Sequence, residues 1–586
     1  MTPAEIRDLM LTAVSKTGGH LASSLGAVEL SLALFESFDP EKDRVVWDVG
    51  HQAYAWKILT GRADRFDTLR RHGGLSGFPN PAESRADAAV AGHAGVALSV
   101  AEGLAAARDR KGGDEHVVAV IGDSSIVNGT SCEALNNLAS ATRKVIVVLN
   151  DNDMSISRPA GSFSRFLGQL TAGSRYNRVK NAAKKAGRAL RLSFAYGPVH
   201  WAKTRLKSMF LKNTFFEQFG LHYMGPVDGH NVAALKSALA AAKAEPRSVL
   251  LHVVTKKGRG FIPAERNPTK WHGTGPFDYP PQPDLTSPRV PTPTGPESVS
   301  WSDAFGAALT DLARSDSRVV ALTAGMKDGT GLAAFASAFP DRLVDTGIAE
   351  GHMTAFAAGL AAGGMRPVVA VYSTFLQRAV DQVIHDVAIS NLPVVFCVDR
   401  AGVVGADGVT HQGVFDIALL RTVPNLTICQ PKDAADLKAL LEEALKRNGP
   451  TVIRYPRGKC SGTQTPKHPD SPNTDPPRFA IWATGDWYAK ACAVAARTGG
   501  VAVHARYLKP FDAKLLAEQR AAGLRIVSLE NGAVTGGFGE SIGADVRFGW
   551  PDEFIPHGTQ AELERDFGLN EDSLVAALTQ RLNLKS

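Results

Sequence analysis

The stretch HVVAVIGDSSIVNGTSCEALNNLASATRKVIVVLND (residues 116–151) contains two short runs of β-branched residues separated by a helical pattern. Continuous apolar runs joined by a helix are typical of parallel strands that are buried on both faces. The alternation recurs around RPVVAVYSTF (366–375) and LPVVFCVDRAG (392–402), and again around FAIWATGD (479–486) and LRIVSLENG (524–532). We therefore predict an α/β fold of three domains, each a mainly parallel sheet flanked by helices.

Two proline-rich stretches divide the chain. Residues 276–298 and 461–477 carry too many prolines for a helix interior, and such composition favours extended chain. We interpret both as linkers. They leave three segments, 1–275, 299–460 and 478–586, which we predict to be the three domains.

Composition excludes several classes of function. The chain has 586 residues, 44% hydrophobic and 21% charged, as in a soluble globular protein. Much of the net charge of +7 lies in residues 178–192 and their continuation to Lys212. Because no nucleic-acid-binding module is recognisable there, we predict no nucleic-acid binding. The 5 cysteines are scattered, with no CxxC pair, which favours a reducing compartment. Because no apolar run is long enough to span a membrane and no signal peptide is visible, we expect a cytoplasmic protein without membrane contact.

Polar residues follow both apolar runs of the opening stretch. Asp123 ends the first run and Asn152 follows the second. Neighbouring parallel strands would place both residues at one edge of the sheet, where ligands bind in open α/β sheets. A carboxylate and an amide oxygen suit Mg²⁺ held with a phosphate group, and a helix following Ser124 and Ser125 would direct N–H groups at that phosphate. Alternatively, Ser125 is only a helix cap and Asp123 a turn residue.

Further motifs bring a resemblance to a known family. Residues 122–124 and 150–152 are similar to the thiamine-diphosphate motif, GDG followed after a helix and a strand by NDN. Motifs in the same order as in the 1-deoxy-D-xylulose-5-phosphate synthase family, a branch of the transketolase-like superfamily, extend the resemblance over nearly the whole chain. They are GHLASSLGAVELSLAL (19–34), WDVGHQAYAWKILTGR (47–62), YMGPVDGHN (223–231), TKKGRGFIPAE (255–265), IAEGHMTAFAAGLA (348–361), VYSTFLQRAVDQVIHDVA (371–388), DRAGVVGADGVTHQGVFD (399–416) and RYPRG (454–458).

The resemblance implies an activity. It is the decarboxylative condensation of pyruvate with D-glyceraldehyde 3-phosphate through an enamine on thiamine diphosphate, with Mg²⁺ as the metal, in isoprenoid and thiamine biosynthesis. Residues 1–275 would bind the diphosphate and Mg²⁺, 299–460 would bind the pyrimidine, and 478–586 would be the C-terminal transketolase-like domain. A homodimer is also implied. Close relatives catalyse other carboligations, so the motifs alone do not fix the reaction.

The resemblance also implies the roles of individual residues. The catalytic residues would be Glu350, which would hydrogen-bond the aminopyrimidine, and His20, His51, His411 and His272. The cofactor would be bound by His51, Gly92, His93, Ala94, Ser124, Ser125, Asn152, Phe261, Glu350 and Phe375, and the metal by Asp123, Asn152 and Met154. The acceptor would be bound by Tyr372, Arg378, Arg400, Asp407 and Arg454, because arginine offers a planar fork to phosphate oxygens. Taken singly, each histidine is compatible with a structural role and each arginine with a surface ion pair.

The chain departs from the family pattern around the cofactor. The altered positions are Ala94 and Gly95, where the family has serines, Ser124, Ser125, Phe261 and Gly351. We hypothesise that the hydroxyls gained at Ser124 and Ser125 compensate for those lost at Ala94 and Gly95. The alternatives are a diverged thiamine-diphosphate carboligase with another donor or acceptor, and a catalytically weak paralogue. The basic segment 158–212 is predicted to be mobile near the entrance of the site.

Overall fold

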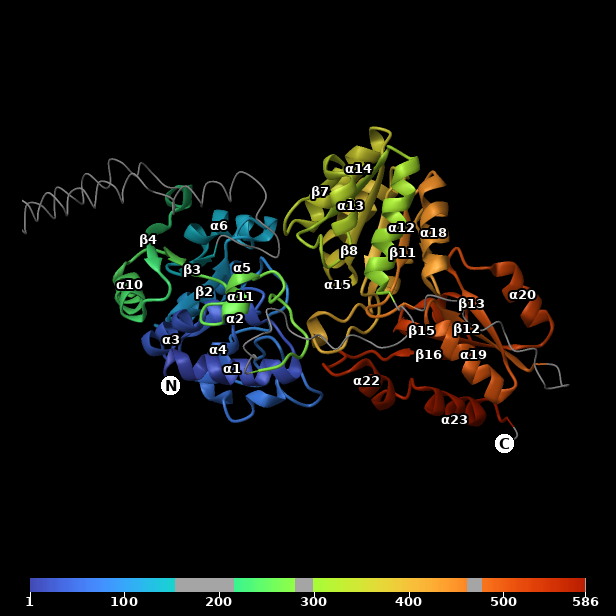
Figure 1. Ribbon diagram of the computed structural model, residues 1–586, viewed down its shortest axis with the longest axis horizontal. Coiled ribbons are helices and arrows are strands. Elements are labelled where there is room, and N and C mark those ends of the chain that lie inside the picture. The colour runs from blue at the N-terminus through green and yellow to red at the C-terminus, as the bar shows by residue number, and fades with distance from the viewer. Residues whose placement is uncertain (153–214, 280–298, 461–476, 585–586) are drawn as a thin grey trace, which may run out of the picture. The chain divides into compact units, whose positions relative to one another are not determined.

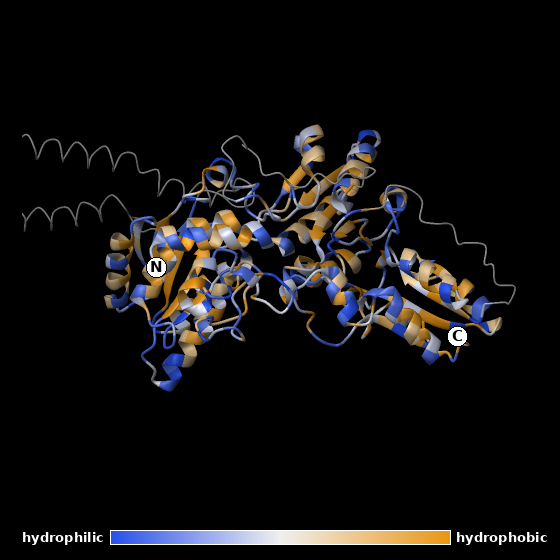
Figure 2. Cartoon of the chain, turned by 60° about the horizontal axis from the view of Figure 1, so that its bottom comes forward, coloured by the Kyte–Doolittle hydropathy of each residue, from blue (hydrophilic) through white to orange (hydrophobic). Residues whose placement is uncertain are grey.

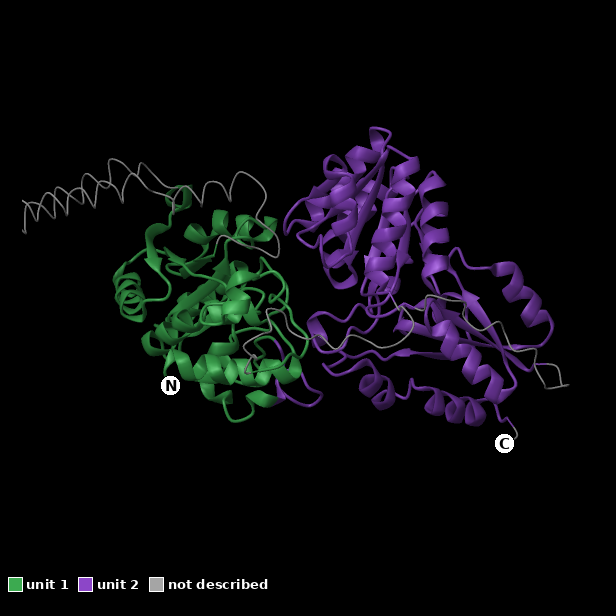
Figure 3. Cartoon of the chain, in the orientation of Figure 1, with its two compact units in different colours: residues 1–67, 78–288 green, residues 68–77, 289–586 purple. Residues whose placement is uncertain are grey.

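The structure is a computed structural model that describes residues 1–152, 215–279, 299–460 and 477–584 (Figure 1). Met154, the segment 158–212 and most of both predicted linkers lie outside the described residues. The chain forms two compact units (Figure 3). Unit 1 consists of residues 1–67 and 78–288, and unit 2 consists of residues 68–77 and 289–586.

Unit 1 is built on a parallel sheet with the strand order β1-β2-β3-β5-β4. Its strands are β1 (Arg44–Trp47), β2 (Val117–Gly122), β3 (Ile146–Asp151), β4 (His222–Asp228) and β5 (Val249–Val254). Alternate residues of β2 enter two different cores: Val118 and Val120 pack into one, and Val117, Ala119 and Ile121 into the other. The sheet is therefore buried on both faces, as its continuous apolar strands predict.

Helices cover this sheet. They are α1 (Pro3–Thr17), α2 (Leu21–Gly26), α3 (Val28–Ser37), α4 (Tyr54–Lys57), α5 (Ala97–Lys111), α6 (Gly129–Ala141), α10 (Val232–Ala244) and α11 (Ile262–Arg266). Helix α4 continues into one wider, π-helical turn at Ile58–Arg62, which Gly61 interrupts with a φ of 87°. Figure 2 shows hydrophobic residues along the strands and hydrophilic residues on outward helix faces.

Unit 2 contains two sheets. The larger has the order β14-β10-β11-β9-β8-β6-β7 and the smaller β13-β12-β15-β16. The strands are β6 (Val319–Thr323), β7 (Leu343–Asp345), β8 (Arg366–Tyr372), β9 (Val395–Asp399), β10 (Thr427–Cys429), β11 (Thr451–Arg454), β12 (Phe479–Thr484), β13 (Val501–Ala505), β14 (Tyr507–Lys509), β15 (Arg525–Ala533) and β16 (Val546–Trp550). All pairings are parallel except that of β14 with β10.

The helices of unit 2 alternate with these strands. They are α12 (Trp301–Ser315), α13 (Ala333–Ala338), α14 (Glu350–Ala362), α15 (Ser373–Leu376), α16 (Val380–Gln382), α17 (Asp416–Leu420), α18 (Ala434–Lys446), α19 (Trp487–Thr498), α20 (Ala513–Ala521), α21 (Phe538–Ser541), α22 (Gln560–Asp566) and α23 (Glu571–Arg581). A π-helical turn at Val383–Ala388 follows α16. In the part of the chain that the structure describes, no helix combines the length and the apolar character that a bilayer span requires.

The described residues form three sheets, and the two compact units do not coincide with the three predicted domains. One hydrophobic core contains residues of both sheets of unit 2, among them Val371 of β8 and Trp482 of β12. The stretch 461–477 therefore separates two sheets that share one core. Residues 68–77 also leave the first predicted domain, because Arg70 pairs with Asp407 at 2.5 Å.

Candidate active site

The predicted metal ligands lie at one edge of the sheet in unit 1. Strands β2 and β3 are adjacent and parallel, with Gly122 opposite Asn150, so Asp123 and Asn152 both follow the carboxyl ends of their strands. Asp123 is 7% exposed, and burial, together with Asp151, raises the pKa of its carboxyl to about 6. The side-chain oxygen of Asn152 is buried without a hydrogen-bond partner. Such oxygens suit a cation, whose charge would compensate for burial.

The turn after β2 differs from both alternatives that the sequence suggested, a helix that directs N–H groups at a phosphate and Ser125 as a helix cap. Helix α6 begins only at Gly129, and its N-cap is Asn128, whose side chain accepts a hydrogen bond from Thr130 N at 3.1 Å. Ser125 is therefore not the cap. The N–H of Ser124 donates to Asp123 Oδ1 at 2.8 Å and that of Ser125 to the carbonyl of Gly122 at 3.1 Å. The expectation that a helix follows these serines directly, with free N–H groups, is wrong, because the turn uses those groups itself.

Asn128 also explains one departure from the family pattern. Gly95 has a φ of 83°, and a Cβ atom there would lie 2.6 Å from Oδ1 of Asn128. Any side chain at residue 95 would therefore collide with the amide. The N–H of Gly95 donates to Asp48 Oδ1 at 2.9 Å, and Ser131 Oγ donates to the carbonyl of Gly95 at 3.1 Å. Asn128 fills the volume that a residue larger than glycine would need.

Three predicted histidines form a cluster in unit 1. The ring centroids of His20 and His51 lie 6.0 Å apart, those of His20 and His272 5.8 Å, and those of His51 and His272 5.2 Å. Gly19 precedes His20 with a φ of 149°, and a Cβ there would lie 2.6 Å from the hydroxyl oxygen of Tyr54. That hydroxyl also accepts the N–H of His20 at 3.1 Å. The glycine is thus required for the close approach that fixes His20.

His51 and His272 are neutral at physiological pH. Burial lowers the pKa of His51 and of His272 well below the usual value, and neighbouring positive groups, Lys257 among them, act in the same direction. Nδ1 of His51 is buried without a partner. A neutral imidazole can donate or accept a proton at a carbonyl oxygen, which is the role the sequence predicted for this cluster.

Lys257 is a site residue that the sequence prediction missed. It is 7% exposed, and burial lowers the pKa of its ammonium to about 8, while Asp123 opposes that shift. A buried cation next to the predicted metal site would attract phosphate oxygens. It lies in the TKKGRGF string, where two consecutive lysines follow β5, so a cation beyond a strand end was the available clue.

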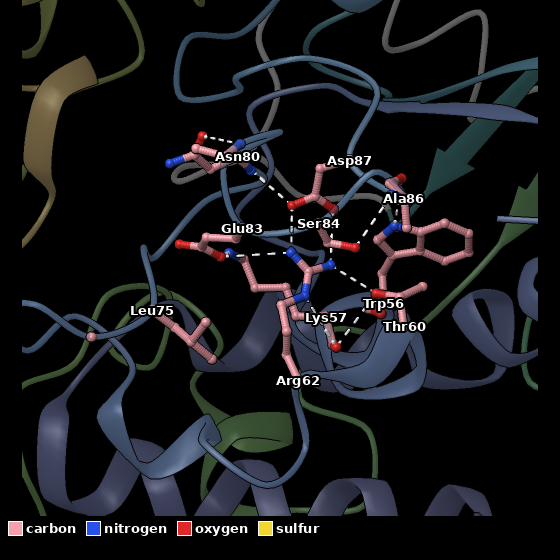
Figure 4. Close-up of polar contacts among 12 residues, drawn as sticks. Trp56, Lys57, Thr60, Arg62, Leu75, Asn80, Glu83, Ser84, Ala86 and Asp87 are labelled. Carbon is pink, nitrogen blue, oxygen red and sulfur yellow. Dashed lines mark hydrogen bonds and ion pairs between the residues drawn. The ribbon is translucent and has the colours of Figure 1, made fainter. Parts of the chain in front are cut away.

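A buried network of charges joins α4 and the π-helical turn after it to the loop of residues 78–91 (Figure 4). Arg62 donates two hydrogen bonds to Asp87, at 2.6 and 3.0 Å, and Lys57 donates to Glu83 at 2.5 Å. Burial lowers the pKa of Lys57. The network fixes the loop of residues 78–91, which packs against the histidines.

Two residues of this loop approach the segments that carry His51 and His20. Cδ of Pro79 lies 2.3 Å from where a Cβ of Gly50 would be, and the ring of Phe78 lies 5.4 Å from that of His20. The loop ends at the predicted cofactor residues Gly92, His93 and Ala94, which precede α5 in irregular structure. Phe261, predicted to bind cofactor, packs edge-on against Trp271, with ring centroids 5.0 Å apart.

Glu350 is the first residue of α14 in unit 2. It is 5% exposed, and burial raises the pKa of its carboxyl, although Arg378, 3.9 Å away, acts in the opposite direction. Its Oε2 is buried without a hydrogen-bond partner. An unsatisfied buried carboxylate is costly, so this atom is prepared to bond a ligand.

Aromatic rings extend the site in unit 2. Phe375 stacks on Tyr372 with centroids 5.5 Å apart and meets His411 edge-on at 5.7 Å. Arg400 lies over the ring of Tyr372, at 4.0 Å from its centroid, and the non-glycine φ of 58° at Arg400 is an unusual backbone conformation. The hydroxyl of Tyr372 donates to the carbonyl of Gly329 at 3.1 Å. The structure therefore brings the predicted residues Tyr372, Phe375, Arg400 and His411 together.

Arg454 requires a correction. The structure makes it 1% exposed and pairs it with Asp416, at 3.0 and 3.1 Å, with further bonds to Gln430 and the carbonyl of Asn531. These partners occupy its guanidinium, so it joins the two sheets of unit 2 and is not placed to bind an acceptor.

Arg457, three residues later in the same RYPRG string, stands with the acceptor group instead. It lies 3.5 Å from Asp407, and Arg400 and Tyr372 are among the groups that influence its pKa, which burial lowers. Arg454 ends β11, whereas Arg457 lies beyond the strand end, where ligands of α/β sheets bind.

The described residues fit thiamine diphosphate and Mg²⁺. Partnerless buried atoms occur at three predicted contacts: the side-chain oxygen of Asn152, Nδ1 of His51 and Oε2 of Glu350. These are a hard oxygen for a cation, an imidazole nitrogen and a carboxylate, which are the donor types that the resemblance assigns to metal, substrate and aminopyrimidine.

Comparisons with known proteins define the class first. Residues 297–462 match the family described as the pyrimidine binding domain of transketolase. Together with the parallel sheets, this match confirms the predicted transketolase-like α/β fold class. Transketolase from Campylobacter jejuni aligns over 99% of this chain and 98% of its own at 17% identity, with a TM-score of 0.44. Transketolase from Leishmania mexicana aligns over 99% and 98% at 20% identity, with a TM-score of 0.43.

The family follows from closer relatives. Residues 2–255 match the family described as 1-deoxy-D-xylulose-5-phosphate synthase. The proteins of that name from Desulforudis audaxviator and Caldanaerobacter subterraneus are 45% and 43% identical, over 98% of this chain and 93% and 95% of theirs. The chain belongs to the 1-deoxy-D-xylulose-5-phosphate synthase family. This membership confirms the predicted enzyme class, a thiamine-diphosphate-dependent transferase, and the predicted cofactors, thiamine diphosphate and Mg²⁺.

Proposed function

We propose that this protein condenses pyruvate with D-glyceraldehyde 3-phosphate, releasing carbon dioxide and forming 1-deoxy-D-xylulose 5-phosphate, a precursor for isoprenoids and thiamine. The observation that carries the choice of acceptor is the group around Tyr372, where Arg400 lies 4.0 Å from the ring centroid and Arg457 lies 3.5 Å from Asp407. Two arginines at one place suit a phosphorylated substrate, because each guanidinium can bond two phosphate oxygens. Asp407 accepts hydrogen bonds from the acceptor's hydroxyl groups.

The residues of unit 1 hold the cofactor. Asp123 and Asn152 bind Mg²⁺, and Lys257 offsets the negative charge of the diphosphate. Thiamine diphosphate supplies the carbanion chemistry that the side chains of a protein lack. His51 and His272 stay neutral, and together with His20 they exchange protons with the carbonyl and hydroxyl oxygens of the substrates.

Glu350 holds a proton at the aminopyrimidine. Burial raises the pKa of its carboxyl, which favours a proton shared with the cofactor nitrogen over a fully ionised carboxylate. Phe375 packs on the pyrimidine ring. His411, edge-on to Phe375, faces the same group of residues.

The protein acts as a homodimer in the cytoplasm. Helix α14, the turn Val383–Ala388 and the residue that follows this turn expose apolar side chains on unit 2: Phe356 is 39% exposed, Ile384 38% and Ile389 69%. A partner subunit would remove these side chains from water. Analytical ultracentrifugation of the purified chain tests the dimer, and a monomer at micromolar concentration would contradict it.

A direct assay tests the reaction. The purified protein is mixed with Mg²⁺, thiamine diphosphate, pyruvate and D-glyceraldehyde 3-phosphate, and carbon dioxide and the pentulose phosphate are measured. We expect both products from the wild-type chain and neither from Glu350→Ala, which should keep its fold. Substantial turnover by Glu350→Ala would contradict the role of this carboxyl.

A second candidate is a carboligase that uses another donor or acceptor. The altered rim of the cofactor site favours it: Gly351 leaves only 3.1 Å between a would-be Cβ and Gln382 Oε1, and Asn128 fills the space beside Gly95. Cofactor binding without the pentulose phosphate would identify this candidate. Carbon dioxide release from pyruvate in that assay then indicates a changed acceptor, and no release indicates a changed donor.

A further inference from the structure

A buried amide joins three segments beneath the predicted metal site of unit 1. The side chain of Asn150 donates through Nδ2 to Gln52 Oε1 at 2.7 Å, and its Oδ1 accepts the hydroxyl of Thr255 at 2.6 Å. Gln52, Asn150 and Thr255 are 4%, 2% and 8% exposed. Gln52 lies in the turn before α4, Asn150 near the end of β3 and Thr255 just beyond β5, so one side chain links three separate stretches of the chain.

A second branch starts from the neighbouring residue. His252 is fully buried between Asp151 and Tyr223: Nε2 lies 2.8 Å from the carboxylate and Nδ1 2.8 Å from the phenol oxygen. A neutral imidazole protonated at Nε2 satisfies both contacts, since it donates to the carboxylate and accepts the phenol O–H. The backbone of Asp151 is held as well, because its carbonyl accepts the N–H of Thr255 at 2.8 Å.

Each branch ends next to a residue of the site. Gln52 follows His51, Asn150 and Asp151 precede Asn152, and Thr255 stands two positions before Lys257. The backbone ladder between β3 and β5 ends at the pair Asp151 and Val254. Beyond that pair, the two strands are joined by the backbone bond from the N–H of Thr255 to the carbonyl of Asp151 and by the side-chain bond between Thr255 and Asn150.

We propose that Gln52, Asn150 and Thr255 are positioning residues that set His51, Asn152 and Lys257 relative to one another. The inference rests on the proposed function, because the groups being positioned are those that hold Mg²⁺ and the diphosphate. None of the three side chains needs to touch the cofactor. Partners behind the ligands of a metal typically change affinity about 10- to 100-fold when they are removed.

Thr255 is the most informative residue to substitute, because its hydroxyl can be removed without changing the shape of the side chain. Thr255→Val keeps the shape of the side chain, removes the donor and leaves Asn150 Oδ1 buried without a partner. Thr255→Ser keeps the donor. Ser248→Ala is the matched control, because Ser248 Oγ accepts the N–H of Val145 at 3.0 Å and so links the same two strands at their opposite ends.

The measurement is the dissociation constant of thiamine diphosphate in the presence of Mg²⁺, by isothermal titration calorimetry on the full chain. We expect Thr255→Val to weaken binding about 10- to 100-fold, and Thr255→Ser and Ser248→Ala to stay within about threefold, because neither removes the bond to Asn150. At saturating cofactor, kcat of Thr255→Val should recover toward the wild-type value. Gln52→Met, which removes the other partner of Asn150, should act in the same direction and serves if Thr255→Val does not fold.

Several results overturn the inference. Wild-type affinity in both Thr255→Val and Gln52→Met would do so, and so would an equal loss in Ser248→Ala, which would mean that any buried bond between these strands matters. If the variants differ as expected but the wild-type chain makes no pentulose phosphate, the positioning stands and the proposed reaction fails. If the wild-type chain does not bind thiamine diphosphate, both fail.

Discussion

The charged network of unit 1 gives the most demanding test of the structure. Lys57 and Asp87 have fully buried side chains, and Arg62 and Glu83 are 3% and 10% exposed. The two cations and two anions balance. Asp87→Asn preserves the shape of the side chain but leaves Lys57 and Arg62 facing a single carboxylate. Breaking one buried pair in this way costs about 3–5 kcal/mol, since the remaining charge stays desolvated.

Removing a complete pair should cost much less. Lys57→Met combined with Glu83→Gln removes one charge of each sign, so no unpaired charge is left in the interior. Replacing both partners of a buried pair by groups of similar volume is often close to neutral. We therefore expect the double variant to be more stable than Lys57→Met alone, although it carries one substitution more.

Amide hydrogen exchange measures this loss of stability. It reports on the network alone, whereas global unfolding of the chain would involve both compact units. The network holds residues 78–91, so their amides report its opening. A loss of about 3–5 kcal/mol corresponds to exchange roughly two to four orders of magnitude faster in Asp87→Asn. Exchange within tenfold of the wild type in that variant would refute the reasoning. It would also be refuted if the double variant exchanged faster than Lys57→Met.

The remaining predictions concern the rims of the site and its pH dependence. Arg457→Ala should raise KM for D-glyceraldehyde 3-phosphate about 10- to 100-fold, as expected for a lost charged hydrogen bond, and leave KM for pyruvate nearly unchanged. Arg454→Ala should instead lower the melting temperature of the apoprotein, because it leaves the buried carboxylate of Asp416 without its ion-pair partner. Steady-state kinetics and calorimetry distinguish the effects of the two substitutions. Gly95→Ser should weaken thiamine-diphosphate binding in calorimetry, and the added substitution Asn128→Ala should not restore it, because Cβ of Asn128 itself lies 2.7 Å from the position of the added Cβ. The folded pKa of His51 lies below the unfolded value of about 6.5, so the unfolded chain takes up protons first as the pH falls. Stability present above pH 6.5 should therefore decline below it, and the decline should be shallower in His51→Asn.

The sequence could predict the sheets because their signal is local. Strands β2 and β3 are continuous apolar runs, and their burial on both faces follows from that composition alone. The compact units could not be predicted in the same way. A proline-rich stretch at 461–477 indicates a break in secondary structure, but whether two sheets share one core depends on residues as distant as Val371 and Trp482.

The site was predictable where a motif fixes the position of a residue along a strand. Asp123, Asn152 and Glu350 follow this rule, since each stands at the end of a strand or at the start of a helix. The choice between Arg454 and Arg457 was not predictable, because both lie in RYPRG and only partners far away in the chain distinguish them. Arg454 meets Asp416 and Asn531, whereas Arg457 approaches Asp407.

At two of the positions that depart from the family pattern, a neighbouring side chain occupies the space that the missing side chain would have filled. At Gly95 a side chain is missing, and Asn128 fills the space with its amide 2.6 Å from the position of the absent Cβ. At Gly351 the absent Cβ would lie 3.1 Å from Oε1 of Gln382, so the glycine again leaves a neighbouring amide in place. A site losing its function through drift would accumulate holes, because nothing would select a matching neighbour. Two glycines whose missing atoms are replaced by packed amides indicate instead a cofactor site rebuilt for continued use, which argues against the catalytically weak paralogue and leaves the choice of substrates as the question for the direct assay.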